Sequence, residues 1–166
     1  MILIFCFFVS ICLAIGERIG FDVIDINSES NRKPLARIDF KFTQKVGKYS
    51  VDIQSFESIA IPLMTVTDFD INTIEQTNKQ LIIVIDEIGK MEAFSDIFRK
   101  GVKQLFDSDV SSKSYRILAS IPAKRNIQML EEIHSKYANR EIHINRSNRN
   151  QMADRVVNML CETAIR

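Results

Sequence analysis

Two adjacent acidic residues, Asp86 and Glu87, follow an uninterrupted apolar run at residues 81–85 (LIIVI). Such a run predicts a strand that is buried on both faces of a sheet. The strand would carry two carboxylates out of a dry core to the mouth of a pocket. There Asp86 could hold Mg²⁺ beside a triphosphate, and Glu87 could orient and deprotonate an attacking water. This is the pattern of a Walker B strand, although any buried strand must end in something polar.

A Walker B strand is normally accompanied upstream by a phosphate-binding loop of the pattern G-x-x-x-x-G-K-[ST]. The chain has 5 glycines, and none of them belongs to such a loop. The nearest approach, Gly47-Lys48, has Phe42 where the first glycine should be and Tyr49 where the Mg²⁺-binding hydroxyl should be. Without that loop, little in the sequence would attract a polyanion to the two acids.

Other chemistry is not indicated by the composition. The 3 cysteines have neither disulfide-framework nor zinc-site spacing, and the histidines, His134 and His143, are isolated. Lys and Arg number 22 against 21 Asp and Glu, for a net charge of +1, and hydrophobic residues make up 46%. These values exclude a disordered chain and argue against a broad electrostatic surface for nucleic acid, so we expect no nucleic-acid partner.

The hydrophobic pattern changes along the chain. Residues 18–26, 35–42 and 48–53 are predicted strands of an antiparallel meander. A short helix at 56–61 follows, with Ser55 as its N-cap and Pro62 disturbing its end. Residues 68–80 are polar and predict a loop or a weak helix.

From residue 81 onward, predicted strands alternate with amphipathic helices. The strands are 81–85, 115–120 and 141–145, and the helices are 94–106, 127–137 and 148–165. This alternation with short links predicts a parallel sheet with crossover helices. Ligands in such sheets bind at the carboxyl ends of the strands. The candidate site positions are therefore Asp86 and Glu87, Ser120, and residues 145–150.

The string VIDEIGKME at residues 84–92 resembles the signature of the nucleoside-triphosphatase family of P-loop proteins, to which the cancer-related nucleoside-triphosphatases belong. Further segments resemble the same family in order, and together they span roughly residues 18–160. They are RIGFDV at 18–23, VGKYSVD at 46–52, SFE at 55–57, ILASIP at 117–122 and NRN at 148–150.

The resemblance implies a P-loop NTPase-like α/β fold and Mg²⁺-dependent hydrolysis of nucleoside triphosphates, ATP and GTP among them, to diphosphate and phosphate. It implies Asp86 as the acid on the metal side and Glu87 as the base. Ser120 could sense the γ-phosphate or position water, or could simply terminate its strand. Asn148 or Arg149 could contact phosphate or base, or could be an N-cap and a solvated arginine. A cytoplasmic location is also implied.

The family pattern begins with a strand, a Walker A loop and a helix that have no counterpart in this sequence, where they are missing or replaced. We therefore expect weak binding of NTP–Mg²⁺ and turnover near background. Residues 17–166 would form the NTPase-like domain, with the β insertion at about 18–53 and the Walker B half at about 81–166. The alternatives are an NTPase whose N-terminal part is absent from this sequence, an inactive relative that serves as a binding module, and a secreted or membrane-anchored domain.

Residues 1–16 (MILIFCFFVSICLAIG) carry no charged side chain. Residues 2–15 are shorter than the roughly 20 residues of a spanning helix but have the length of a signal-peptide core. A signal would direct the chain to the secretory pathway, and an anchor would bring it to a membrane. Alternatively, residues 2–9 are a buried strand that takes the place of the missing Walker A strand, or the segment is an artefact of where the gene model begins. The oligomeric state is left open.

Overall fold

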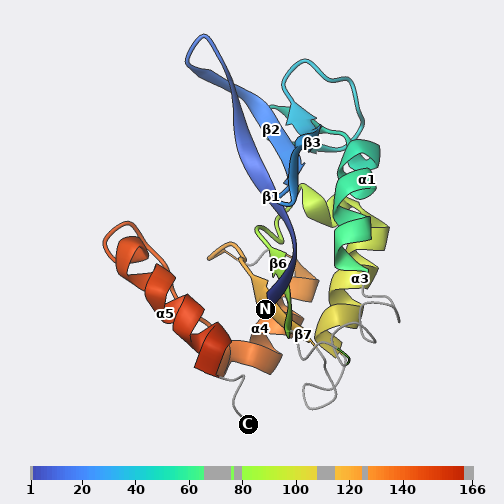
Figure 1. The fold of residues 1–166 in the computed structure, drawn as a ribbon. Helices are drawn as coiled ribbons and strands as arrows, with labels where there is room; N and C mark the ends of the chain where they lie inside the picture. Colours follow the sequence, from blue (N-terminus) through green and yellow to red (C-terminus); the bar gives the residue numbers. More distant parts are fainter. Residues whose placement is uncertain (1, 66–75, 77–79, 108–114, 125–126, 163–166) are drawn as a thin grey trace. The chain divides into compact units, whose positions relative to one another are not determined.

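The computed structural model describes residues 2–65, 76, 80–107, 115–124 and 127–162. The chain divides into two compact units, residues 1–131 and residues 132–166. The first unit contains one seven-stranded sheet together with helices α1 (Ile53–Met64) and α3 (Asp96–Asp107). Helix α4 (Gln128–Tyr137) begins at the end of the first unit, and α5 (Arg149–Glu162) lies in the second (Figure 1).

The sheet has the strand order β4-β5-β3-β2-β1-β6-β7. Strand β1 runs parallel to β6, and β6 runs parallel to β7, whereas every other neighbouring pair is antiparallel. The expected α/β class, a parallel sheet joined to an antiparallel β insertion, is confirmed. The strand bounds are β1 Ile2–Ala14, β2 Glu17–Asp25, β3 Ser28–Arg37, β4 Lys45–Val46, β5 Tyr49–Val51, β6 Gln80–Ile85 and β7 Tyr115–Ala119.

Strand β1 is long because two different neighbours hold its two ends. Its residues 2–7 pair with β6, and its residues 7–14 pair with β2. The apolar N-terminal segment therefore lies directly beside the predicted Walker B strand, and it continues five residues beyond the expected end at residue 9. Ile15 and Gly16, with φ of 51° and 78°, make the left-handed turn into β2.

Helices α1 and α3 cover one face of the sheet in the first unit (Figure 1). Three phenylalanines, one from β1 and one from each of these helices, meet edge to face between the sheet and the helices. The ring centroids of Phe7 in β1 and Phe56 in α1 are 5.8 Å apart, and those of Phe56 and Phe98 in α3 are 5.1 Å apart. All three side chains are fully buried, so this cluster is the centre of the core.

Helix α1 is longer than the sequence pattern indicated. Asp52, rather than Ser55, is the N-cap, because its carboxylate accepts the backbone N–H of Ser55 at 3.0 Å and the Ser55 hydroxyl at 2.8 Å. Pro62 does not end the helix but lies within its last turn. The predicted helix at 56–61 is therefore confirmed as an element, but it begins earlier, at Ile53, and ends later, at Met64.

Other expectations need correction. Residues 141–145 form no strand. They follow the 3₁₀ turn η3 (Ala138–Arg140) as a loop, which side-chain hydrogen bonds close at its end. Strand β3 begins and ends earlier than the predicted 35–42, since residue 28 already pairs with β2. Most of the polar stretch 68–80 lies outside the described residues. Across the described ranges, no helix is both long and apolar enough to cross a membrane.

Candidate functional site

The buried strand β6 ends where the sequence predicted, at Asp86. Leu81, Ile83 and Ile85 are all 0% exposed, and the chain becomes exposed at Asp86 and Glu87. The Asp86 Oδ2 accepts the backbone N–H of Val9 in β1 at 3.1 Å. This bond continues the β1–β6 ladder by one step with a side chain, and it fixes the Asp86 carboxylate at the carboxyl end of the strand.

Ser120, which follows β7, lies beside these two acids. Its backbone N–H donates to the Ile85 carbonyl at 2.9 Å, and its carbonyl accepts the Ile88 N–H at 3.0 Å. The two bonds bracket the Asp86–Glu87 pair, so the structure brings the ends of β6 and β7 together. Ser120 is itself exposed at this edge, as a residue that meets a ligand must be.

The Glu87 carboxyl group lies next to a tight turn at Gly89. A β-carbon on Gly89 would lie 2.8 Å from Oε1 of Glu87 and 2.7 Å from Oε2 of Glu92. A larger residue at this position would therefore displace the Glu87 and Glu92 carboxyl groups from their present places. Although solvent reaches Glu87, the surrounding protein raises the pKa of its carboxyl group, and the negative charge of Asp86 raises it further.

Glu92 is the residue that sequence reasoning left without a role. It begins the 3₁₀ turn η1 (Glu92–Phe94), is 3% exposed, and accepts the Gly89 N–H at 3.1 Å through Oε2. Burial is the main cause that raises its pKa to about 7, with smaller contributions from the charges of Glu87 and Asp86. The spacing of Gly89 and Glu92, three residues apart, is the signal that could have indicated this turn.

Behind the turn, Ser95 joins α1 to the start of α3. Its hydroxyl donates to Oε1 of Glu57 at 2.6 Å and accepts the Phe98 N–H at 3.0 Å, which caps α3. Ser95 is buried. The segment that carries Asp86 and Glu87 is therefore anchored on both helices.

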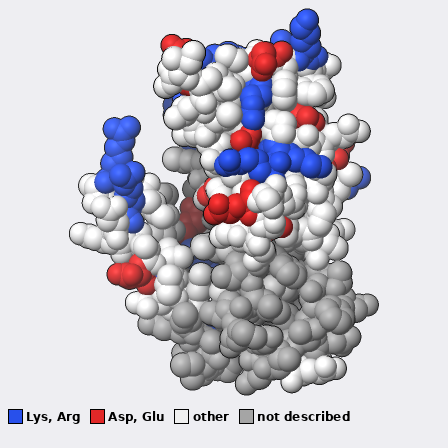
Figure 2. All heavy atoms as spheres, turned by 45° about the horizontal axis from the view of Figure 1, so that its top comes forward, with Lys and Arg blue, Asp and Glu red and all other residues white. Residues whose placement is uncertain are grey.

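The cluster is acidic. Within the described residues, no lysine or arginine forms an ion pair with Asp86, Glu87 or Glu92. No group of three or more potential metal ligands occurs in the same residues either. On the face of the first unit seen in Figure 2, acidic and basic side chains lie next to one another, and neither sign covers a broad area.

A Mg²⁺ ion fits this arrangement in one way. Mg²⁺ is commonly held by one or two carboxylates together with substrate phosphates and water, rather than by a cage of protein ligands. Asp86 is exposed, and only its Oδ2 is engaged by Val9. Its Oδ1 could therefore hold the ion, with the phosphates and water completing the shell.

Asn148 and Arg149 belong to the second unit, at the start of α5. The Asn148 side chain is committed to its own loop, since its Oδ1 accepts the Asn145 N–H at 2.8 Å and its Nδ2 donates to the His143 carbonyl at 2.9 Å. Arg149 is exposed in the first turn of α5, where the helix dipole disfavours a cation. The structure thus brings together Asp86, Glu87 and Ser120 in one unit and describes Asn148 and Arg149 in the other.

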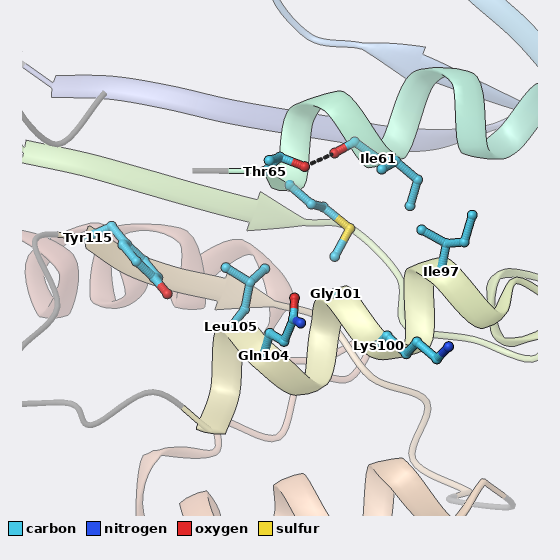
Figure 3. Close-up of a pocket in the computed structure, with 9 residues that line it drawn as sticks. Ile61, Thr65, Ile97, Lys100, Gly101, Gln104, Leu105 and Tyr115 are labelled. Carbon is cyan, nitrogen blue, oxygen red and sulfur yellow. Dashed lines mark hydrogen bonds between the residues drawn. The ribbon is translucent and has the colours of Figure 1, made fainter. Parts of the chain in front are cut away.

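A separate hollow of about 430 Å³ lies between the last turns of α1 and most of the length of α3 (Figure 3). Ile61, Ile97 and Leu105 supply apolar walls, and Tyr115 closes one side. Tyr115 pairs with Leu81, at the opposite ends of β6 and β7 from Asp86 and Ser120. With no carboxylate among its lining residues, this hollow has no part in the acidic site.

Comparison with known proteins relates the whole arrangement to one family. A family model described as NTPase matches residues 5–157. The match begins before residue 18, where the resemblance in the sequence began, and therefore includes most of β1. The cancer-related nucleoside-triphosphatase of Homo sapiens is 34% identical over 149 residues, which cover 86% of this chain and 73% of that protein.

Bacterial relatives also have the name nucleoside-triphosphatase. The nucleoside-triphosphatase THEP1 of Thermotoga petrophila is 30% identical over 145 residues, covering 87% of this chain and 72% of its own length. The crystal structure of THEP1 from Aquifex aeolicus, a P-loop NTPase fold, has a TM-score of 0.68 and 28% identity, and covers 86% of this chain and 77% of that one. The family match, the relatives and the strand-end acids all indicate that this chain belongs to the NTPase family.

Proposed function

We propose that this chain interacts with a nucleoside triphosphate and Mg²⁺ at the carboxyl ends of β6 and β7. The observation that carries the proposal is the placement of Asp86 and Glu87 at the exposed end of a strand whose Leu81, Ile83 and Ile85 are fully buried, with hydrogen bonds from the Ser120 backbone on either side of them. The printed names of the relatives, nucleoside-triphosphatases, support a triphosphate as the substrate.

Each of the three residues has a distinct proposed role. Asp86 would hold the metal ion, and the bond from the Val9 N–H to its Oδ2 would fix the orientation of its carboxylate. Mg²⁺, when bound, would neutralise charge that develops on the phosphate oxygens. Glu87 accepts a proton from the attacking water, and its raised pKa brings it nearer to the operating pH of a general base. The Ser120 hydroxyl donates to the γ-phosphate or to that water.

The same site explains why we expect low activity from these 166 residues. The described site is built of acids, with no paired cation, and the sequence holds no G-x-x-x-x-G-K-[ST] loop. The hydrogen-bond donors and cations that such a loop would supply usually make the largest contribution to stabilising the transferred phosphoryl group. Losing one donor of this kind typically lowers kcat by a factor of about 10²–10³. We therefore expect turnover close to background and weak nucleotide binding. An inactive binding module of the same fold is the second candidate, favoured by the same lack of cations.

Phosphate release tests the proposal directly. The 166-residue chain is incubated with ATP or GTP and Mg²⁺, beside Glu87→Gln and Glu29→Gln. Glu29 is an exposed residue of β3 and serves as the matched control. We expect a rate near background, with any excess lost in Glu87→Gln and kept in Glu29→Gln. Fast turnover that depends on Glu87 would contradict the expected weakness. Turnover that is unaffected by Glu87→Gln and Asp86→Asn would contradict the site itself.

We further propose that the chain is cytoplasmic, as the family resemblance implies. Residues 2–7 of β1 pair with β6, which supports their retention in the folded protein. The intact mass of the protein expressed in its own cells tests this. A mass that lacks residues 1–16 would indicate a cleaved signal and contradict the proposal.

A further inference from the structure

The later part of β1 has an open edge. Strand β6 pairs with β1 only as far as Phe7, whereas β2 follows β1 to Ala14 on the other side. The N–H of Val9 points toward the β6 side, where Asp86 accepts it. Because alternate residues of a strand direct their backbone groups to the same edge, the N–H and C=O of Ile11 also face this side. Among the described strands, none pairs with β1 there.

The side chains along this edge are apolar and exposed. Ile11 is 56% exposed and Leu13 is 61% exposed, and they are followed by Ile15 at the turn. Residues 10–14 (SICLA) contain no charge and no proline. Natural proteins usually protect an edge with lysine, proline or a covering element, because an unpaired apolar edge invites another strand. In Figure 1 this segment is the part of the β1–β2 hairpin that extends beyond β6.

The chemistry of the edge selects its occupant. Unpaired backbone groups need a strand, and an uncharged apolar strand is matched best by another of the same kind. Of the other strands described in this chain, β2, β3, β4 and β7 carry charged residues, and β5 and β6 are each paired on both edges. Only residues 10–14 of β1 combine an open edge with a complete lack of charge, so the segment best matched to this edge is the same segment in a second copy.

We propose that two copies of this chain associate through their β1 edges, residues 10–14 pairing antiparallel about a two-fold axis. An isologous contact of this kind uses the same β1 edge of each copy and therefore closes at a dimer. Ile11 and Leu13 would face their counterparts across the axis, and the net charge of +1 opposes the association only weakly. The proposal does not depend on whether the acidic site hydrolyses nucleotides.

Sedimentation equilibrium of the full chain at micromolar concentration tests the dimer. We expect twice the chain mass of 19.1 kDa for the natural sequence and 19.1 kDa for Ile11→Lys, because each lysine would place a charge opposite the apolar Leu13 of the other copy and bring two like charges to one short edge. Ile97→Lys is the matched control: the residue type is the same, it is 55% exposed, and it lies in α3. It should remain dimeric. Leu13→Lys provides a second edge variant if Ile11→Lys does not fold.

Three results would overturn the proposal: a natural chain that is monomeric, an edge variant that folds and remains dimeric, or a control that loses the dimer equally. Sedimentation with phosphatidylcholine vesicles tests the alternative that the β1 edge binds a lipid surface instead of a second copy. A monomer that binds these vesicles, and loses binding in Ile11→Lys, would identify a lipid surface as the occupant in place of a second copy.

Discussion

The middle and the end of β1 have the same kind of side chains and opposite surroundings. Cys6 and Phe7, in its middle, are 4% and 1% exposed, whereas Ile11 and Leu13, near its end, are largely exposed. Both segments are apolar and uncharged. The difference is that β6 and the helices α1 and α3 cover the first, while β2 alone accompanies the second.

The comparison shows that burial along β1 is set by the length of β6 rather than by the composition of β1. Strand β6 ends at Ile85, and the Asp86 side chain supplies the last bond to β1 at Val9. The point where β1 changes from core to surface is therefore also the candidate catalytic edge. The acids need an exposed strand end, and that same end leaves the rest of β1 uncovered.

The largest expected effect comes from removing the segment altogether. Deletion of residues 1–16 takes away the strand between β2 and β6, so the sheet would lose its central pairing and the core would lose Phe7. We expect no cooperative thermal unfolding of residues 17–166, measured by circular dichroism. A melting temperature equal to that of the full chain would show that β1 is dispensable, and it would contradict the alternative given from the sequence, in which residues 2–9 take the place of a missing family strand.

A point substitution in each part of β1 sharpens the comparison. Phe7→Ala removes a ring packed edge to face on Phe56 and Phe98, and should lower the free energy of unfolding by about 3–5 kcal/mol. Leu13→Ala, at a residue 61% exposed in the single chain, is the matched control and should change it by less than about 0.5 kcal/mol when both variants are measured at concentrations low enough for the chain to be monomeric. Urea denaturation measures both. Equal losses would mean that the end of β1 is covered in solution.

The sequence predicted those parts of the fold whose pattern is local. The run at 81–85 identified β6, and the strand-end rule placed Asp86, Glu87 and Ser120 at one edge, where the structure has them. The helical periodicity likewise located α3. In these segments, the hydrophobic pattern and the tertiary environment agree.

Other features depend on partners that are distant in the sequence. Residues 141–145 alternate like a strand, but the side chains of Asn145 and Asn148 close a loop instead. The buried position of Glu92 follows from the turn at Gly89, which no periodicity reveals. The exposure of Ile11 follows from the end of β6, since the apolar run at residues 2–15 gives no hint of a boundary between core and surface.

The last effect that we predict depends on pH and concerns the turn that follows β6. The Glu92 carboxyl has its pKa raised from 4.5 to about 7 in the folded chain. Between these values, the folded state holds a proton that the unfolded state has released. The stability from this group is therefore complete below about pH 4.5 and declines as the pH rises toward 7, by at most about 1.4 kcal/mol per pH unit.

Glu92→Gln removes this titration, because the amide stays neutral while its oxygen can still accept the Gly89 N–H. Urea denaturation at a series of pH values should show a shallower decline for Glu92→Gln than for the natural chain, whereas exposed Glu29→Gln keeps the natural slope. Identical slopes in all three proteins would mean that water reaches Glu92 in solution. The turn at Gly89 would then be open to water, and Glu87 would no longer be held beside it. The end of β6 would also be less well ordered, so the contrast between the covered and the uncovered part of β1 would be weaker.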